Sequence, residues 1–416
     1  MFRSSDYLKN VTTLATGTTL AQGVSLITAP ILYRIYDKDD YGTLALYIGI
    51  VAIIGVFSTM QYLQPILLEK EDEDAKKVMW LNRSINAVVT VVSLVLILFL
   101  GNNIATWLNN PLITPWLYLI PVSIFFSGQN KIFRVWANRK KKYKIMSFNT
   151  ILTAILVPVV SISIGLLREG ALGLFLGLIA SQMIPALVLL IALTRNEDLG
   201  LNYFDFGFIK KKAKQYKNFP LYSLPSEFVN RLTNQLPVFM ISIYVGPAVV
   251  GVYNLCIRML GLPIQLLGNA LGEVYKQKAT EDYNKTGDYS SIFIKTLKAT
   301  FFTSLIPVLI LIFFASELFV FFFGQKWLEA GILAQFMAPL FMLRLINAPL
   351  SYGIFIHNKL HIDMIASVIF GVGSLLCFTL GFNYLDNYMH VLIIFTLFYC
   401  ITYLIMIIYN YRLAIK

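Results

Sequence analysis

The chain has 416 residues, of which 57% are hydrophobic and only 13% are charged, and its mean hydropathy is +0.69. Soluble domains average roughly 45–50% apolar and about 25% charged residues. This composition therefore excludes an ordinary soluble globule and indicates that lipid solvates much of the chain. The net charge of +12 does not require a nucleic-acid partner, because the Lys and Arg of a membrane protein concentrate in its cytoplasmic loops. We expect no nucleic-acid binding.

Twelve apolar stretches follow one another along the chain, each bounded by charged or turn-forming residues. A helix of about 20 residues crosses the roughly 30 Å hydrocarbon core of a bilayer, so each stretch predicts one membrane span. The first stretch has a short basic start but no small-residue cleavage site, so we expect a retained helix rather than a signal peptide. The predicted spans are 11–33, 43–67, 81–100, 113–133, 145–167, 171–193, 220–245, 248–272, 296–322, 330–356, 362–385 and 388–409.

The positive charges predict the orientation of these spans. If the N-terminus is cytoplasmic, the cytoplasmic connections contain most of the 34 Lys and Arg, whereas the outer connections contain only Arg34, Lys38, Arg168 and Lys326. Basic and charge-poor connections alternate along the whole chain, as the positive-inside rule requires. We therefore expect a multi-pass membrane protein with both termini in the cytoplasm.

The longest polar connection, residues 194–219, divides the spans into six and six. Because six is even, both halves start on the same side, which is the arrangement of parallel repeats about an axis along the membrane normal. Ile35-Tyr36 and Ile243-Tyr244 end the first span of each half and faintly repeat one another. The predicted fold is thus an all-α integral membrane protein of about 12 transmembrane helices. We expect two six-helix bundles, residues 1–205 and 206–416, with pseudo-two-fold symmetry.

Polar residues inside the spans are costly in hydrocarbon and usually face a bundle interior or a water-filled cavity. At about 100° per residue, the polar residues of the seventh span lie on one narrow face of the predicted helix, and so do those of the eighth span. We expect them to line a hydrated, cationic cavity between the halves, because Arg stays charged and its fork matches phosphate oxygens. The candidate substrate-binding residues are Glu227, Asn230, Arg231 and Asn234 in the seventh span, Asn254, Arg258, Gln265 and Asn269 in the eighth, and Arg344 in the tenth.

Packing offers an alternative explanation for the polar faces. Small polar residues also join membrane helices to one another, which would account for the Thr-rich face of the first span and for Ser123, Ser127 and Arg134 in the fourth. Glu227 and Arg231 are four residues apart and could neutralise each other. Both explanations remain open for these residues.

The sequence offers no chemical site of another kind. The three cysteines have no CxxC spacing, and His357 and His361 have only Asp363 as a nearby carboxylate, so we expect neither a metal site nor a cofactor. The outer connections are short, so we also expect no catalytic residues. The acidic run 69–74 is interpreted as a solvated loop at a helix end, and the basic run 139–144 as a topology signal.

Two segments resemble a known family. Residues 32–55, LYRIYDKDDYGTLALYIGIVAIIG, resemble the opening of bacterial polysaccharide-biosynthesis flippases of the O-antigen type. Residues 219–279 resemble them more strongly, through Pro225-Ser226, Gln235-Leu236-Pro237, Gly251-Val252-Tyr253 and Arg258. The turn at residues 37–42, DKDDYG, is a looser version of the family's usual TPEDFG turn. The family belongs to the multidrug/oligosaccharidyl-lipid/polysaccharide exporter superfamily.

The resemblance implies a function in building the cell envelope. It implies that the chain lies in the bacterial plasma (inner) membrane and flips undecaprenyl-pyrophosphate-linked oligosaccharide repeat units across it by alternating access. The implied partners are that lipid-linked oligosaccharide, membrane lipids and possible export machinery such as a polysaccharide polymerase. One alternative is a cation-coupled multidrug exporter of the same superfamily, which would favour acidic cavity residues over the arginines present here. The other is an integral-membrane polymerase or ligase, which would call for larger outer loops.

Overall fold

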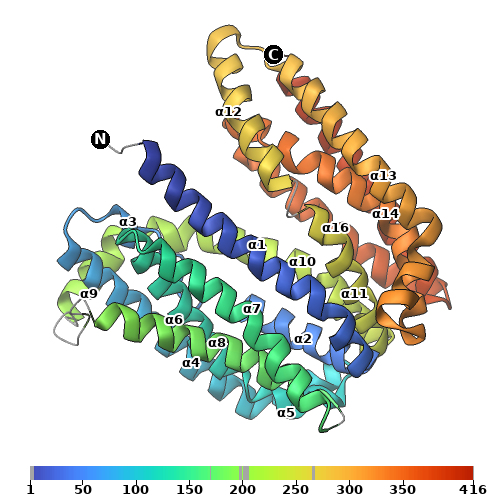
Figure 1. The fold of residues 1–416 in the computed structure, drawn as a ribbon, viewed down its shortest axis with the longest axis horizontal. Coiled ribbons are helices and arrows are strands. Elements are labelled where there is room, and N and C mark those ends of the chain that lie inside the picture. Colours follow the sequence, from blue (N-terminus) through green and yellow to red (C-terminus); the bar gives the residue numbers. More distant parts are fainter. Residues whose placement is uncertain (1–3, 169, 196–198, 200–205, 265–267, 416) are drawn as a thin grey trace. The chain divides into compact units, whose positions relative to one another are not determined.

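A computed structural model describes residues 4–415 except 169, 196–198, 200–205 and 265–267. Within these ranges every regular element is a helix (Figure 1). The chain forms two compact units, Met1–Arg231 and Leu232–Lys416. The boundary between them falls inside α10 (Leu224–Tyr244). The division at residues 205 and 206 rests on the span count and stays a prediction.

Each unit is a set of long helices joined by short connections. The first unit contains α1 (Ser4–Ile35), α2 (Lys38–Ile54), α3 (Pro65–Leu68), α4 (Asp72–Trp107), α5 (Thr114–Leu117), α6 (Ile120–Arg139), α7 (Tyr143–Gly165), α8 (Leu172–Thr194) and α9 (Phe206–Gln215). The second contains α11 (Pro247–Pro263), α12 (Asn269–Thr286), α13 (Ser290–Phe323), α14 (Leu328–Leu350), α15 (Gly353–Ile356), α16 (Leu360–Tyr384) and α17 (Tyr388–Ala414).

Seven helices in the described part of the chain are long and apolar enough to cross a membrane. An eighth span is present if Pro111–Leu117 and Ile120–Arg139, which meet at 52°, are counted as one. A helix also occurs at each of the other predicted spans. However, α1 and α10 lack a sufficiently apolar window, and α2 and α11 have only 17 residues each. The structure is thus that of an all-α, multi-pass membrane protein, and the number twelve stays a prediction.

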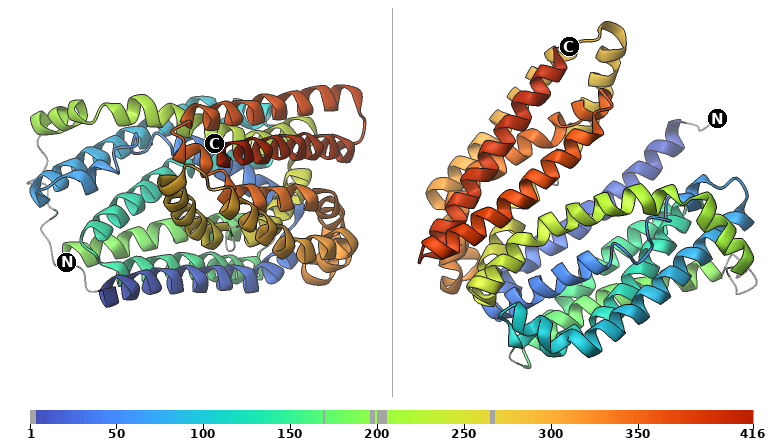
Figure 2. Two further views of the ribbon diagram at one scale, coloured as in Figure 1. Left: turned by 90° about the horizontal axis from the view of Figure 1, so that it is seen from above. Right: turned by 180° about the vertical axis from the view of Figure 1, so that it is seen from behind.

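The helices of the first unit pack in a definite set of pairs. The helix α6 contacts α2, α4 and α8, and α7 contacts both α1 and α8. Figures 1 and 2 show these helices running side by side. The close approach of α7 and α8 depends on small residues, because a Cβ on Gly177 would lie 2.4 Å from the Ser161 hydroxyl oxygen. Small residues at such contacts are typical of membrane helices.

The second unit repeats this set of pairs. There α14 contacts α11, α13 and α17, and α16 contacts α17. The pair equivalent to α1 and α7 is α10 and α16, where the Thr233 hydroxyl lies 3.5 Å from the Ser367 carbonyl and the rings of Tyr244 and Phe382 stack at 4.9 Å. The same order of spans therefore makes the same contacts in both units, as internal repeats would.

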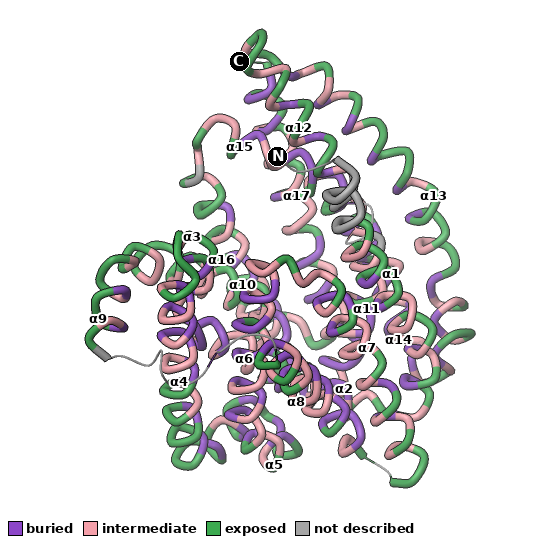
Figure 3. Tube along the Cα trace, turned by 60° about the vertical axis from the view of Figure 1, so that its left-hand side comes forward, coloured by how far each residue is buried: buried purple, intermediate pink, exposed green. Residues whose placement is uncertain are grey.

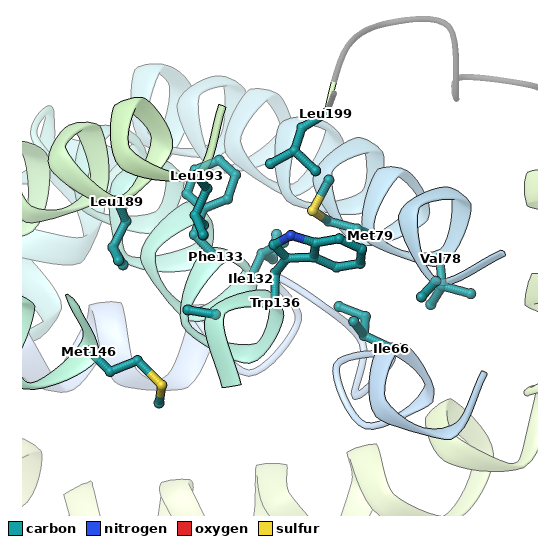
Figure 4. Close-up of a cluster of buried hydrophobic side chains, with 12 residues drawn as sticks. Ile66, Val78, Met79, Ile132, Phe133, Trp136, Met146, Leu189, Leu193 and Leu199 are labelled. Atoms are coloured by element: carbon teal, nitrogen blue, oxygen red, sulfur yellow. The ribbon is translucent and has the colours of Figure 1, made fainter. Parts of the chain in front are cut away.

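The core of the first unit gathers around α6. Trp136 is fully buried, and Figure 4 shows its indole ring between Met79 of α4 and Ile66 of α3. The outer faces of the helices instead expose large apolar side chains, such as Phe99, which is 81% exposed, and Ile306, which is 68% exposed. Figure 3 shows exposed residues along much of the length of the helices. Such extensive apolar exposure is unfavourable in water and is expected where lipid surrounds a protein.

Candidate functional site

The second predicted span is not one helix. The helix α2 ends at Ile54, regular helix resumes only at Pro65, and Met60 and Gln61 have left-handed backbone conformations with φ of +42° and +63°. A non-glycine residue in this conformation costs about 1–2 kcal/mol. Asn82 of α4, which is fully buried, holds the interruption because its Nδ2 donates a hydrogen bond of 2.9 Å to the Tyr62 carbonyl. The prediction of an uninterrupted span over 43–67 is therefore wrong.

The eighth predicted span is also not one regular α-helix. The helix α11 ends at Pro263, the flanking residues Ile264 and Gly268 are π-helical, and α12 begins at Asn269. The regular second helix of each half thus has 17 residues. In transporters built from repeats, discontinuous helices at equivalent positions of the two halves form the substrate and ion sites. The interruption after α2 and the change from α-helix to π-helix after α11 are therefore the strongest indication of where a site lies.

The end of α11 at Pro263 bears on the predicted polar face of the eighth span. Asn254 and Arg258 lie one turn apart on α11, the former half-buried and the latter exposed. Gln265 lies outside the described residues, and Asn269 is the first residue of α12. Because 100° per residue holds only in regular α-helix, the continuous polar face beyond Pro263 stays a prediction.

The seventh span carries an ion pair. The Arg231 Nε lies 2.7 Å from the Glu227 Oε1, and the two side chains are 55% and 37% exposed. Glu227 and Arg231 therefore do neutralise each other, as one of the two explanations from the sequence held. Asn230 and Asn234 are exposed on the same helix. An ion pair this exposed contributes only about 0–1 kcal/mol to stability, so it is not needed for folding.

Lys131 is a member of this group that the sequence analysis missed. It lies on α6, is exposed, and is close enough to Glu227 and Arg231 for their charges to act on its ammonium group. The three side chains together have a net charge of +1. The ring of Phe228, the neighbour of Glu227, lies 5.5 Å from that of Phe57 in the interrupted second span. The structure thus brings the interruption and the charged group into one region of the first unit.

Arg344 has a comparable position in the second unit. It is exposed on α14, and its guanidinium lies 5.8 Å from the ring centre of Phe341 on the same helix. Within the described part of the chain it forms no ion pair. Its charge acts on Tyr253 of α11 and on Tyr399 and Tyr403 of α17. Arg258 is on α11, which packs against α14, so both arginines belong to one helix pair.

The polar face of the fourth span serves helix packing instead. Ser123 shares a hydrogen bond of 2.7 Å with the Tyr47 hydroxyl of α2. Arg134 donates hydrogen bonds of 3.2 Å to Asn149 and 2.9 Å to Thr150, both on α7. These bonds join α6 to its neighbours, so the packing explanation is correct for this face.

The interpretation of the acidic run 69–74 as a solvated loop at a helix end fits residues 70–73, which are exposed around the start of α4, but it is wrong for Glu69. The Lys212 Nζ of α9 lies 2.6 Å from Glu69 and 3.1 Å from Asp74, and the Lys212 and Glu69 side chains are only 7% and 8% exposed. Burial by itself lowers the pKa of Lys212, but the hydrogen bonds to the two carboxylates outweigh it and raise the pKa above its usual value. Asp72 pairs with Arg139 and Lys140 at the end of α6.

No metal site is recognisable in the part of the chain that the structure covers, since no three His, Cys, Asp or Glu side chains gather there. The three cysteines are free thiols, and Cys256 is fully buried between α11 and α14 with its Sγ 3.8 Å from the Met337 sulfur. A buried thiol in apolar surroundings is inert. The chemistry available to the site is therefore electrostatic and hydrogen bonding.

Comparison with solved structures places this fold among flippases and exporters. A lipid II flippase, MurJ, in its inward closed conformation matches 95% of the chain with a TM-score of 0.73 at 14% identity, and 89% of that protein is covered. An inward-facing multidrug resistance transporter of the MATE family, in the MOP superfamily, matches 96% of the chain with a TM-score of 0.73 at 13% identity, and 94% of it is covered. At these identities the likeness establishes the fold alone.

Sequence comparison identifies the family. The lipopolysaccharide biosynthesis protein WzxC of Escherichia coli K12 is 21% identical over 355 residues, which are 84% of this chain and 69% of that protein. The succinoglycan biosynthesis transport protein ExoT of Rhizobium meliloti is 23% identical over 255 residues, or 60% of this chain and 49% of that protein. The family model described as polysaccharide biosynthesis protein matches residues 31–331. The predicted resemblance is confirmed, and the chain belongs to the polysaccharide biosynthesis protein family.

Proposed function

We propose that the protein is a flippase that moves an undecaprenyl-pyrophosphate-linked oligosaccharide across the bacterial plasma membrane. The related proteins named above are a transport protein, a flippase, an exporter and a polysaccharide biosynthesis protein, and none of these names describes an enzyme. The protein is accordingly a membrane transporter. A sugar pyrophosphate is too polar to cross hydrocarbon unaided, so its passage requires a wet path with compensating positive charge.

The observation that carries this proposal is the pair of short second helices, α2 and α11, each near cationic side chains. In the first unit the interruption after α2 lies beside the group of Lys131, Glu227 and Arg231, which has a net charge of +1. In the second, Arg258 is on α11 and Arg344 on the helix packed against it. Guanidinium groups bind phosphate oxygens in a bidentate manner, so these arginines suit a pyrophosphate.

The proposed mechanism is alternating access by the two halves around a hydrated cationic cavity. The residues proposed to line it are Glu227, Asn230, Arg231, Asn234, Asn254, Arg258, Gln265, Asn269 and Arg344, with Lys131 added. The pyrophosphate would be held by the cations and the sugars by the amides, while the prenyl chain stays in lipid. Polysaccharide polymerases or other export proteins are the proposed partners that receive the sugar on the outer side.

A multidrug exporter remains the second candidate, because the MATE transporter has the same TM-score as the flippase. Exporters of cationic drugs need acidic groups facing the substrate. Glu227 is the acidic member of the proposed lining, and it is already paired with Arg231. Charge therefore favours the anionic substrate.

The direct test uses proteoliposomes that contain a fluorescent undecaprenyl-pyrophosphate-linked oligosaccharide. Its appearance in the opposite leaflet is measured as the fraction accessible to an added glycosidase. We expect Arg258→Ala to lower the rate at least tenfold. Arg258→Lys should recover part of it, because a point charge remains but the bidentate fork is lost. Lys285→Ala, which removes an exposed lysine that pairs with Glu281 on α12, is the matched control.

Two results would contradict the proposal. One is a normal rate for Arg258→Ala at equal protein content. The other is wild-type protein that moves no lipid-linked sugar but expels a cationic dye such as ethidium, which would establish the exporter instead.

A further inference from the structure

The helix α9 has two chemically distinct faces. At about 100° per residue, Lys210, Lys211 and Lys214 fall within about 100° of arc, and all three are exposed. We refer to these three residues as the lysine face. Ile209 and Lys212 lie on the opposite side of the helix and are buried. The lysine face is therefore a true surface of the helix rather than part of its packing.

Contacts on the buried side fix the rotation of α9 about its own axis. Lys212 lies 2.6 Å from Glu69, and Tyr216, just after the helix, donates a hydrogen bond of 3.0 Å to the same carboxylate. The Tyr62 hydroxyl donates to the Ala213 carbonyl at 3.1 Å. These bonds join α9 to residues on either side of α3, so the lysine face must point away from the first unit.

The lysine face is not neutralised within the described part of the chain. Lys210, Lys211 and Lys214 form no ion pair there, because the nearby Glu69, Asp72 and Asp74 bind Lys212, Arg139 and Lys140. Exposed lysines of α12 behave differently. There Lys276 pairs with Glu273, and Lys278 and Lys285 pair with Glu281. The charge of α9 thus differs from that of α12 in being uncompensated within the described residues, which indicates an external anion.

The position of α9 relative to the bilayer follows from α4. This helix has 36 residues, so at about 1.5 Å per residue it is about 54 Å long and exceeds the roughly 30 Å hydrocarbon core. Its polar first turns, which begin with Asp72, Glu73 and Asp74, must project beyond the hydrocarbon. The helix α9 packs against α4, and Leu221 and Tyr222, shortly after α9, are 59% and 75% exposed. Exposed apolar side chains next to lysines are typical of a membrane interface.

We propose that the lysine face binds the phosphate groups of anionic phospholipid headgroups. Clustered lysines beside a membrane span attract anionic lipids in this way. The buried Lys212 anchors the helix to the first unit, and the three outer lysines attach that anchored helix to the lipid surface. The lysine face is distinct from the proposed substrate site. The proposal that it binds lipid can therefore be correct whether or not the flippase proposal is.

The test measures the binding of short-chain fluorescent lipids to the full chain in detergent. Wild-type protein should bind phosphatidylglycerol at least tenfold more tightly than phosphatidylcholine. The triple variant Lys210→Gln, Lys211→Gln, Lys214→Gln should lose this preference while keeping the wild-type melting temperature, because the three side chains are exposed.

The matched control removes the same number of lysines from α12. The triple variant Lys276→Gln, Lys278→Gln, Lys285→Gln has the same change in net charge and should keep the preference. A preference that survives in the α9 variant, or is lost equally in both, would overturn the proposal. So would displacement of the lipid by equimolar inorganic pyrophosphate, which would make the lysine face a site for a soluble phosphate.

Discussion

At the scale of single residues, Lys212 is the charge that anchors α9 to the first unit. Its side chain is 7% exposed and bridges Glu69 and Asp74, which flank the start of α4. Removing one member of a buried pair leaves the other charge uncompensated, which costs about 3–5 kcal/mol when burial is complete. Since the pKa of Lys212 is raised, its stabilising contribution is complete below the unfolded pKa of about 10.4. It is lost only as the pH rises through the folded pKa.

We expect Lys212→Met to destabilise the protein by roughly 2–3 kcal/mol, less than a fully buried pair, because Asp74 stays 35% exposed. The thermal unfolding of the purified protein at pH 7 measures this. Lys77→Met is the control, since its pair with Asp74 is a partly exposed one at 3.7 Å worth about 0–1 kcal/mol. Equal melting temperatures for the two variants would show that the buried pair adds nothing.

The ion pair on α10 leads to a second prediction at this scale. Arg231→Ala should lower transport about tenfold, or ~1.4 kcal/mol, because the group with Lys131 and Glu227 falls from a net charge of +1 to zero. Adding Glu227→Gln restores the charge to +1 and should recover most of the rate in the proteoliposome assay. A double variant as slow as the single one would mean that Arg231 binds substrate directly.

At the scale of elements, the interrupted second span is the feature that hydropathy does not report. Residues 55–64 leave the helix inside a stretch whose composition suits a continuous span. Backbone groups in a membrane require partners, and Asn82 supplies one for the Tyr62 carbonyl, while the Ser58 hydroxyl donates to the Gly55 carbonyl at 2.7 Å. The interruption is therefore built into the first unit by specific hydrogen bonds.

We expect Asn82→Leu to destabilise the protein by about 1–3 kcal/mol, the usual effect of leaving a buried acceptor without a partner. It should also slow transport more than its loss of stability explains, because the interruption lies beside the proposed site. Thr90→Val is the control on the same helix, since the Thr90 hydroxyl donates only to the Asn86 carbonyl one turn earlier. Unfolding and transport are measured on the same preparations, and unchanged transport in Asn82→Leu would separate the interruption from function.

At the scale of the whole molecule, the two units share one scheme of helix contacts. The fourth and tenth spans, α6 and α14, are the central helices, and each packs against the second, third and sixth span of its own half. The same order of contacts in both halves is what duplication of a six-span unit produces, and it is the property that alternating access requires.

The predicted orientation is tested by cysteine labelling of intact cells in a background where the native cysteines are alanine. An impermeant maleimide should modify cysteine at Leu112 or Asp386, which are exposed in predicted outer connections, and spare cysteine at Lys214 or Lys278, which are exposed in predicted cytoplasmic ones. All four sites should react once the cells are broken open. Labelling of Lys214→Cys in intact cells would reverse the topology.

The sequence by itself determined the all-helical membrane class, the positions of the helices and the family, because span length, hydropathy and turn motifs are local properties. Only the tertiary structure showed that the second span is interrupted, that Lys131 joins Glu227 and Arg231, and that Glu69 and Asp74 of the acidic run bind Lys212. Each of these depends on partners far apart in the chain: Asn82 and Tyr62 are 20 residues apart, and Lys212 and Asp74 are 138 apart. Local patterns predict which segments enter the membrane, but such buried pairings form only when the helices pack.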